Sequence, residues 1–369
     1  MNEEALAASF GVYLHIPFCT SRCDYCAFAT WTEREEEIDR YVAALLGEIA
    51  RARDESGWRR PGTIFFGGGT PSLLPAEHLV ALIEAIDPLA EAEITVECNP
   101  ESTEGSMVAA IAAAGVNRIS LGVQSRRSHV LASLGRTAHP GAFHRALEAV
   151  WTAGITNYNV DLIYGAVGER TEDLAATLDE VFGVAIAPTH LSAYALTVEA
   201  GTPLDRDPTR HPDEDLQAER YELIDERLGG EGLHWYEISN WARPGSECRH
   251  NLSCWLGGEY RGVGCSAHSH VDGRRFENIV ALDRYLRAAT AGQSTLAREE
   301  RLVGAAALEE ALILRLRTRG GVPMNYLDHS LVEDGLIEQR GDRAVLTLRG
   351  RLLANEVALG LVVPDEGMA

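Results

Sequence analysis

The stretch HIPFCTSRCDYCAF, residues 15–28, places three of the chain's seven cysteines within eight residues. Cys19, Cys23 and Cys26 follow GVYLHI (11–16), a short apolar run that is typical of a β-strand. The cysteine count is odd and the other four cysteines are dispersed, which argues against a disulfide framework. The clustered thiols therefore indicate a metal site on the loop after this strand.

Two kinds of metal site suit the spacing C-x3-C-x2-C. A structural zinc ion needs four nitrogen or sulfur ligands, so a distant cysteine or histidine would have to complete it. A [4Fe–4S] cluster held by three thiolates keeps one iron free for a small molecule. The spacing alone favours the cluster and leaves zinc open.

Composition and charge restrict the class of protein. Apolar residues make up 46% of the 369 residues and charged residues 24%, which are values of a globular chain. A formal net charge of −22 would repel a phosphate backbone, so we expect no nucleic-acid partner. All 33 basic residues are arginine, which excludes lysine chemistry such as a Schiff base or a P-loop. No apolar run is long enough to cross a bilayer and the start of the chain lacks a signal peptide, so we expect a cytoplasmic protein.

Strand-like and helical patterns alternate over the first two thirds of the chain. The strand-like runs are 11–16, 63–67, 93–98, 117–123, 157–165 and 190–196. Helical patterns lie near 36–53, 76–87, 105–114, 142–153 and 172–186. This alternation predicts an α/β fold with a parallel sheet, either a partial barrel or an open doubly wound sheet.

Polar residues close to the ends of these strands favour the barrel. Cys19, the glycines at 67–69, Glu97, Gln124 and Asp161 each follow an apolar run. Barrel enzymes build their sites from the carboxyl ends of the strands, where such residues would meet. We therefore predict a partial (β/α)6 TIM-like barrel with one ligand site at its mouth.

The rest of the chain predicts two further parts. Residues 232–276 are rich in Gly, Trp and Cys and lack a clear period, and from about 295 the order helix, helix, β-ribbon is winged-helix-like. The predicted domains are the barrel at 1–230, an irregular connecting region at 231–294 and a winged-helix-like α+β module at 295–369. We expect this last module to be a lid or a docking module.

Eight motifs in order carry a family resemblance over nearly the whole chain: YLHIPFCTSRCDYCAF, FFGGGTP, ECNPES, NRISLGVQS, VDLIYG, LSAYALTVEAGTP, YEISNWARPG and RHNLSCW. Together they resemble the radical S-adenosylmethionine (SAM) proteins of the coproporphyrinogen dehydrogenase group, and within it the HemW-type haem chaperones. The resemblance implies a radical SAM barrel whose cofactors are a [4Fe–4S] cluster, SAM and haem.

The resemblance also implies the site residues. The cluster would be bound by Cys19, Cys23 and Cys26. The SAM pocket would be formed by Tyr13, Tyr25, Gly68, Gly69, Thr70, Glu97, Gln124, Arg136 and Asp161. Carboxylates can accept hydrogen bonds from ribose hydroxyls or the ammonium, and Arg136 can pair with the methionine carboxylate. For Arg136 a solvated surface position is an equal alternative.

A second motif concerns haem. His250 and Asn251 match the His-Asn-x-x-Tyr pattern that the resemblance links to haem binding, while Cys254 stands in place of the tyrosine. Imidazole and thiolate are both competent ligands of haem iron. The alternative for His250 is a histidine held by hydrogen bonds in a packed loop.

Two departures favour the chaperone over the dehydrogenase. The dehydrogenases carry a further cysteine where this chain has Phe28, and a longer segment before the first strand. We therefore expect a haem chaperone that delivers haem to apo-haemoproteins. The alternatives are an oxygen-independent coproporphyrinogen III dehydrogenase, which decarboxylates propionates oxidatively, and a zinc-binding barrel without a redox role. SAM cleavage would require an electron donor such as flavodoxin or ferredoxin, and transient membrane association is compatible with this reading.

Overall fold

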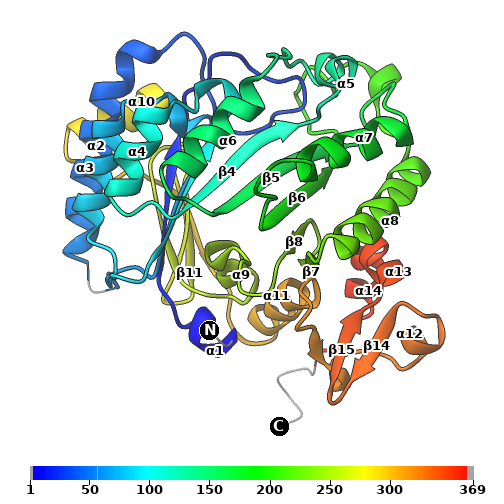
Figure 1. The fold of residues 1–369 in the computed structure, drawn as a ribbon. Helices are drawn as coiled ribbons and strands as arrows, with labels where there is room; N and C mark the ends of the chain where they lie inside the picture. Colours follow the sequence, from blue (N-terminus) through cyan, green and yellow to red (C-terminus); the bar gives the residue numbers. More distant parts are fainter. Residues whose placement is uncertain (1–2, 56, 364–369) are drawn as a thin grey trace.

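The computed structural model describes residues 3–55 and 57–363, and its main feature is a twelve-stranded sheet. The strand order is β12-β11-β10-β9-β1-β2-β3-β4-β5-β6-β8-β7 (Figure 1). Six of these strands lie side by side in chain order and pair in parallel: β1 (Gly11–Ile16), β2 (Thr63–Gly68), β3 (Glu93–Cys98), β4 (Arg118–Gln124), β5 (Asn157–Tyr164) and β6 (His190–Ala195).

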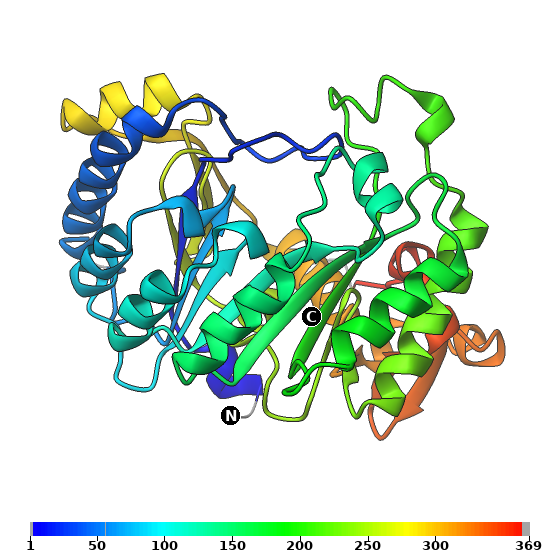
Figure 2. The same ribbon diagram turned by 45° about the horizontal axis from the view of Figure 1, so that its top comes forward.

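The crossover helices lie along one side of this sheet, as Figures 1 and 2 show. They are α2 (Ile38–Arg53), α3 (Ala76–Ile86), α4 (Gly105–Ala113), α6 (Ala142–Thr152), α7 (Thr171–Phe182) and α8 (Glu214–Gly230). A doubly wound sheet reverses its strand order and carries helices on both faces. The sequential order therefore confirms the partial barrel and excludes the doubly wound alternative.

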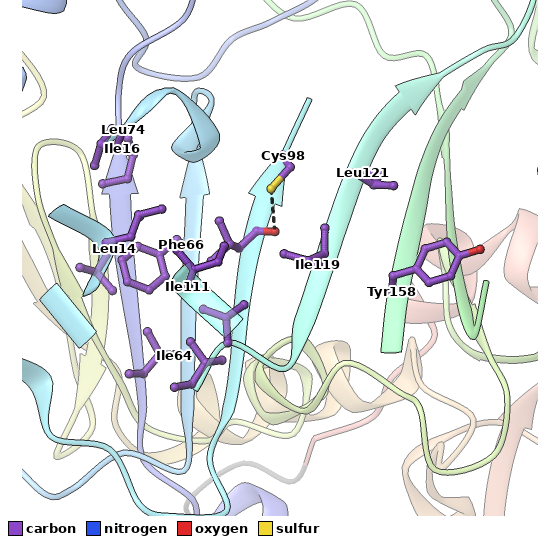
Figure 3. Close-up of a cluster of buried hydrophobic side chains, with 14 of the residues drawn as sticks. Leu14, Ile16, Ile64, Phe66, Leu74, Cys98, Ile111, Ile119, Leu121 and Tyr158 are labelled. Carbon is purple, nitrogen blue, oxygen red and sulfur yellow. Dashed lines mark hydrogen bonds between the residues drawn. The ribbon is translucent and has the colours of Figure 1, made fainter. Parts of the chain in front are cut away.

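Alternate side chains of the strands point to opposite faces, and the two faces differ in chemistry. Leu14, Ile64, Phe66 and Ile119 are fully buried in the core between sheet and helices (Figure 3). Burial of each such side chain contributes about 1.5–3 kcal/mol. The opposite, inner face carries polar side chains: Glu93, Thr95, Glu97, Arg118, Ser120, Asn159, Asp161, His190 and Ser192.

The connecting region is regular, contrary to the expectation of an irregular segment at 231–294. It contains β7 (His234–Glu237), β8 (Asn240–Ala242), α9 (Arg249–Trp255), β9 (Tyr260–Val263), β10 (His268–Val271), β11 (Arg274–Asn278) and α10 (Leu282–Thr290). β9 extends the sheet beside β1 and β8 extends it beside β6. These strands have three to five residues, too few to show a period, and pairing with an existing edge stabilises them.

The C-terminal part forms a second, smaller sheet after β12 (Leu296–Arg301), which itself pairs with β11 of the main sheet. The smaller sheet has the order β13-β15-β14. The C-terminal part consists of α11 (Gly304–Leu316), β13 (Val322–Pro323), α12 (Ser330–Glu333), β14 (Ile337–Arg340), β15 (Arg343–Leu346), α13 (Leu348–Leu352) and α14 (Ala354–Leu359). Leu316, Val322 and Ile337 belong to its own buried core. The winged-helix-like order is present, but the expected second helix is only the four residues of α12. The domain boundaries stay predictions.

Within the described part of the chain, no helix has both the length and the apolar character needed to span a membrane.

Arg351 of α13 joins the small module to α8. Its two Nη atoms donate to the Asp225 carboxylate at 2.7 and 2.8 Å. Its guanidinium lies 4.7 Å from the ring centroid of Trp235 and 5.5 Å from that of Tyr221. A bidentate pair with two aromatic neighbours is the kind of ion pair that contributes measurably.

We expect Arg351→Ala to lower the free energy of unfolding by about 1–3 kcal/mol, because it leaves the Asp225 carboxylate without its cation. Urea denaturation followed by tryptophan fluorescence measures this change. The control is Arg340→Ala, which breaks an exposed pair with Glu338 and should cost under about 0.5 kcal/mol. Equal effects of the two substitutions would contradict a role of Arg351 in docking the module.

Candidate functional site

The cysteine loop, residues 17–34, spans the carboxyl ends of the strands from β1 toward α5 (Ser128–Ser133), as the dark-blue trace in Figure 2 shows. Near β1 the loop is closed by hydrogen bonds from Cys19 N to Trp31 O at 3.0 Å and from Trp31 N to Pro17 O at 2.7 Å. At its far side Asp24 N donates to Leu134 O at 3.1 Å. The Asp24 carboxylate also accepts from Arg210 at 2.7 Å. The loop is therefore closed at its base and fixed at its tip.

The three thiols of this loop are free and partly exposed. The Thr70 hydroxyl donates to Cys19 Sγ at 3.8 Å, and Arg136 Nη1 donates to Cys23 Sγ at 3.5 Å. Burial raises the pKa of the Cys19 and Cys26 thiols. Among the described residues, no group of three or more His, Cys, Asp or Glu side chains is placed to ligate a single metal ion. A [4Fe–4S] cluster instead binds each thiolate to a different iron.

The glycines after β2 pass close to this loop. A Cβ on Gly69 would lie 3.0 Å from Cys19 Sγ and 2.7 Å from Phe18 O, so no side chain fits there. Gly68 has a φ of +111°, which only glycine adopts without strain, and its N–H donates to Glu97 Oε2 at 3.2 Å. The backbone thus approaches both the thiols and a carboxylate.

Tyr13 and His15 of β1 form a hydrogen-bonded connection between the inner face of the sheet and the cysteine loop. His15 Nε2 lies 2.9 Å from the carbonyl oxygen of Ala29, which can only accept, so Nε2 carries the proton. His15 Nδ1 then accepts from the Tyr13 hydroxyl at 3.1 Å. Tyr13 also borders Glu97, since a Cβ on Gly67 would lie 3.1 Å from both side chains.

Arg136 is turned toward the cysteine loop and is not a solvated surface residue. Its Nη2 donates to Asn99 Oδ1 at 3.3 Å and to Gly122 O at 3.1 Å. Asn99 Nδ2 in turn donates to the Thr70 hydroxyl at 3.2 Å. Sequence reasoning missed Asn99, although it stands two residues after Glu97 at the same strand end.

Two further predicted residues lie beside this group. Tyr25 borders both Cys23 and Arg136, and burial raises the pKa of its hydroxyl. Gln124, the last residue of β4, has a φ of +62°, an uncommon value for a residue other than glycine. Its Nε2 would lie 3.1 Å from a Cβ on Gly122. The predicted residues at the mouth are therefore contiguous.

Glu97 and Asp161 are two inner-face carboxylates in different environments. Burial raises the pKa of Glu97 to about 8, and the nearby Asp161 charge adds to this rise. Burial also raises the pKa of Asp161, but hydrogen bonds from Ser120 at 2.9 Å and Asn159 at 2.8 Å oppose the shift. Glu97 therefore holds a proton at neutral pH until a cationic group binds beside it, and Asp161 is the better acceptor.

A hydrogen-bonded chain that sequence reasoning missed runs from Asp161 to α9. Asn159 Nδ2 donates to Asp161, while Asn159 Oδ1 accepts from His190 Nδ1 at 2.7 Å. His190 Nε2 accepts from the Tyr236 hydroxyl at 2.8 Å, and Asn251 Nδ2 donates to the same hydroxyl at 3.4 Å. Burial lowers the pKa of His190 well below its ordinary value, so the imidazole is neutral. The alternation of polar residues in NYNVDLIY was the available signal.

The structure does not bring His250 and Cys254 to the mouth. Both lie on α9, where His250 Nδ1 is 2.9 Å from the hydroxyl of Thr63, the first residue of β2. The cysteine loop follows the other end of β1, so about 15–20 Å of strand separates the two sites. The His250 ring stacks on Phe65 with centroids 5.4 Å apart, and no residue of the described chain is hydrogen-bonded to Nε2.

Burial has opposite consequences for these two candidate ligands. It lowers the pKa of His250 to about 4, so the imidazole is neutral and free of proton competition. It raises the pKa of Cys254 to about 12, so this side chain is a thiol near neutral pH rather than the thiolate that haem iron prefers. His250 is thus the stronger candidate of the two.

We expect Glu97→Gln to gain stability relative to the wild type as pH rises. The folded state holds the Glu97 proton up to about pH 8, while the unfolded state loses it near 4.5, so the wild type loses stability between these values. Gln has no proton to lose, and the difference in free energy of unfolding should grow by about 1–3 kcal/mol from pH 5 to pH 8. Urea denaturation of the apo protein at both pH values measures it.

The matched control for this prediction is Glu84→Gln, an exposed carboxylate on α3. Its effect on stability should not change between pH 5 and pH 8. A difference between Glu97→Gln and wild type that is constant with pH would show that the Glu97 carboxyl titrates normally.

Comparison with known proteins shows the family to which the chain belongs. The family model of the radical SAM superfamily matches residues 13–181. Heme chaperone HemW of Mycobacterium tuberculosis is 41% identical over 96% of this chain and 95% of its own length. Heme chaperone HemW of Escherichia coli is 38% identical over 71% of each chain.

A solved structure shows the shared fold. Coproporphyrinogen III oxidase (HemN) from Escherichia coli, a radical SAM enzyme, superposes with a TM-score of 0.82. The alignment covers 97% of this chain and 92% of that one at 23% sequence identity. Identity to the curated relatives extends over nearly the whole chain, and the chain therefore belongs to the HemW family of haem chaperones within the radical SAM superfamily.

Proposed function

We propose that this protein is a haem chaperone that binds a [4Fe–4S] cluster, SAM and haem and delivers haem to apo-haemoproteins. The observation that carries the proposal is the His250 imidazole, which is neutral and has no hydrogen-bond partner on Nε2 within the described chain. It stands in a motif that resembles the haem-linked motif of the family. The barrel mouth, with its three thiols, supports the cluster and SAM.

The residues at the mouth fit a cluster and SAM. Cys19, Cys23 and Cys26 supply three thiolate ligands, and Arg136 beside Cys23 offsets negative charge there. A bound cluster would offer its fourth iron to the amino and carboxylate groups of SAM. Asp161 suits a hydroxyl group of such a ligand as a buried acceptor, and Glu97 suits its ammonium group, whose binding would release the Glu97 proton.

Haem binding requires a local opening of the fold. His250 is only 7% exposed and is covered by Phe65 and Tyr260. Ligation through Nε2 therefore needs a shift of α9 or of these rings. The residue at the position of the further dehydrogenase cysteine, Phe28, is 66% exposed and offers no ligand.

Apo-haemoproteins are the haem acceptors, and a flavodoxin or ferredoxin would supply electrons if SAM is cleaved. We place the protein in the cytoplasm, where the free thiols stay reduced.

We expect Cys23→Ser to abolish the cluster, because two thiolates do not hold it. After anaerobic reconstitution, iron and sulfide analysis and the absorbance near 400 nm should fall to the level of untreated protein. Cys98→Ser is the control, since Cys98 lies in the core on the outer face, where its thiol donates to Val96 O at 3.7 Å (Figure 3). Full iron and sulfide content in Cys23→Ser would refute the cluster assignment.

We expect His250→Ala to weaken haem binding by about tenfold or more, or to change the Soret band, because it removes the axial imidazole. Cys254→Ser should have a smaller effect, because the Cys254 side chain is a thiol at neutral pH. Haem titration monitored by absorbance measures both, with cluster content as the internal control.

The dehydrogenase function makes the opposite prediction. It requires SAM-dependent turnover of a porphyrinogen and no specific haem affinity. Such turnover, together with identical haem titrations of wild type and His250→Ala, would replace the chaperone proposal.

A further inference from the structure

Arg118 is a buried cation without a bonded partner. It is the first residue of β4, faces the inner side of the sheet and is 2% exposed. Its Nε has no hydrogen-bond partner, and none of the ion pairs or side-chain hydrogen bonds of the described chain involves its guanidinium. A guanidinium has five donors and is always charged, so burial without partners is costly.

The neighbouring carboxylates are already engaged elsewhere. Glu93 Oε1 accepts from the backbone N–H of His250 at 3.1 Å and from the Cys248 thiol at 3.7 Å. Asp161 accepts from Ser120 and Asn159. Both carboxylates act on Arg118 through space, but neither forms an ion pair with its guanidinium among the described residues. The donors of Arg118 therefore remain available to an anion.

The position of Arg118 in the sheet limits which anionic ligand can reach it. Glu93, Cys248 and Tyr236 interact with it electrostatically, and the first two lie at the start of α9. As the first residue of β4, Arg118 therefore lies toward the His250 end of the sheet. Gln124 lies six positions further along β4, at the mouth, where Arg136 is the cation available to a SAM carboxylate. A ligand of Arg118 must therefore reach the α9 end.

We propose that Arg118 binds a propionate carboxylate of haem. This inference rests on the proposed function, because it assumes that His250 ligates the iron of the same haem. The planar fork of a guanidinium matches a carboxylate in two parallel hydrogen bonds. Haem carries two propionates, so the porphyrin can present one to Arg118 while its iron meets His250. Arg118 is then the residue that orients the porphyrin on the inner face.

The test compares haem with its dimethyl ester, in which the propionate charge is removed and the iron is kept. Both are titrated into the full-length protein under identical buffer conditions, and absorbance gives the two dissociation constants. We expect the wild type to prefer haem over the ester by about 10- to 100-fold. Arg118→Gln should lose this preference, because its haem affinity falls to that of the ester while ester affinity is unchanged. Arg118→Lys should keep part of it.

Arg220→Gln is the matched control. Arg220 is also buried and its Nε also lacks a partner, but it pairs with Glu169 at 3.6 Å and lies on α8. This variant should lower the melting temperature and retain the preference for haem. If Arg118→Gln does not fold, two measurements still test the role of Arg118: the preference of the wild type for haem over the ester, and the same preference in Arg118→Lys.

Three outcomes would overturn the role of Arg118. They are a wild type that binds haem and ester equally, an Arg118→Gln protein that retains the preference, and an Arg118→Gln protein whose SAM affinity falls instead of its haem affinity. Absence of any haem binding to the wild type, or binding independent of His250, would instead refute the proposed function.

Discussion

Alternation along the parallel strands is the constraint on which the site depends. Each strand must cover the helices with one set of side chains, and this leaves the other set facing inward. In β4 the sequence Arg118, Ile119, Ser120, Leu121 alternates polar and apolar residues, so Ile119 and Leu121 are buried outward while Arg118 and Ser120 face the interior. Burying polar side chains without hydrogen-bond partners costs free energy, and most of these inner-face groups form hydrogen bonds with one another. Among the described residues of this face, the Arg118 guanidinium and the Thr95 hydroxyl are the exceptions.

The distribution of chemistry between the two ends of the sheet follows from strand direction. All six strands β1–β6 run the same way, so their carboxyl ends bring the cysteine loop, Glu97 and Arg136 together. At the amino ends, the first residues of β2 and β3 contact α9 instead. The hydrogen-bonded chain through Asn159, His190 and Tyr236 is the polar connection between these ends. Because the imidazole in this chain is neutral, it fixes orientation without adding charge to the interior.

The sequence predicted the barrel strands well and the connecting region poorly. Runs such as TIFFG and NYNVDLIYG are long enough to show strand character, and the observed strands begin and end within one residue of the predicted runs. The three residues of β8 carry no such pattern, because they form a strand through pairing with β6 and β7. The contiguity of residues at the mouth was predictable from their strand-end positions. The contacts of His250 were not, since Thr63 is 187 residues away and nothing local relates the two.

The double closure of the cysteine loop has an energetic consequence for assembly. A free segment of this length would lose about 2 kcal/mol of configurational entropy when its ends are brought together. Here the bonds between Cys19 and Trp31, and between Asp24 and Leu134, complete that step during folding of the polypeptide. A cluster bound as proposed would therefore assemble on thiols whose backbone is already confined, because folding of the polypeptide has brought them together.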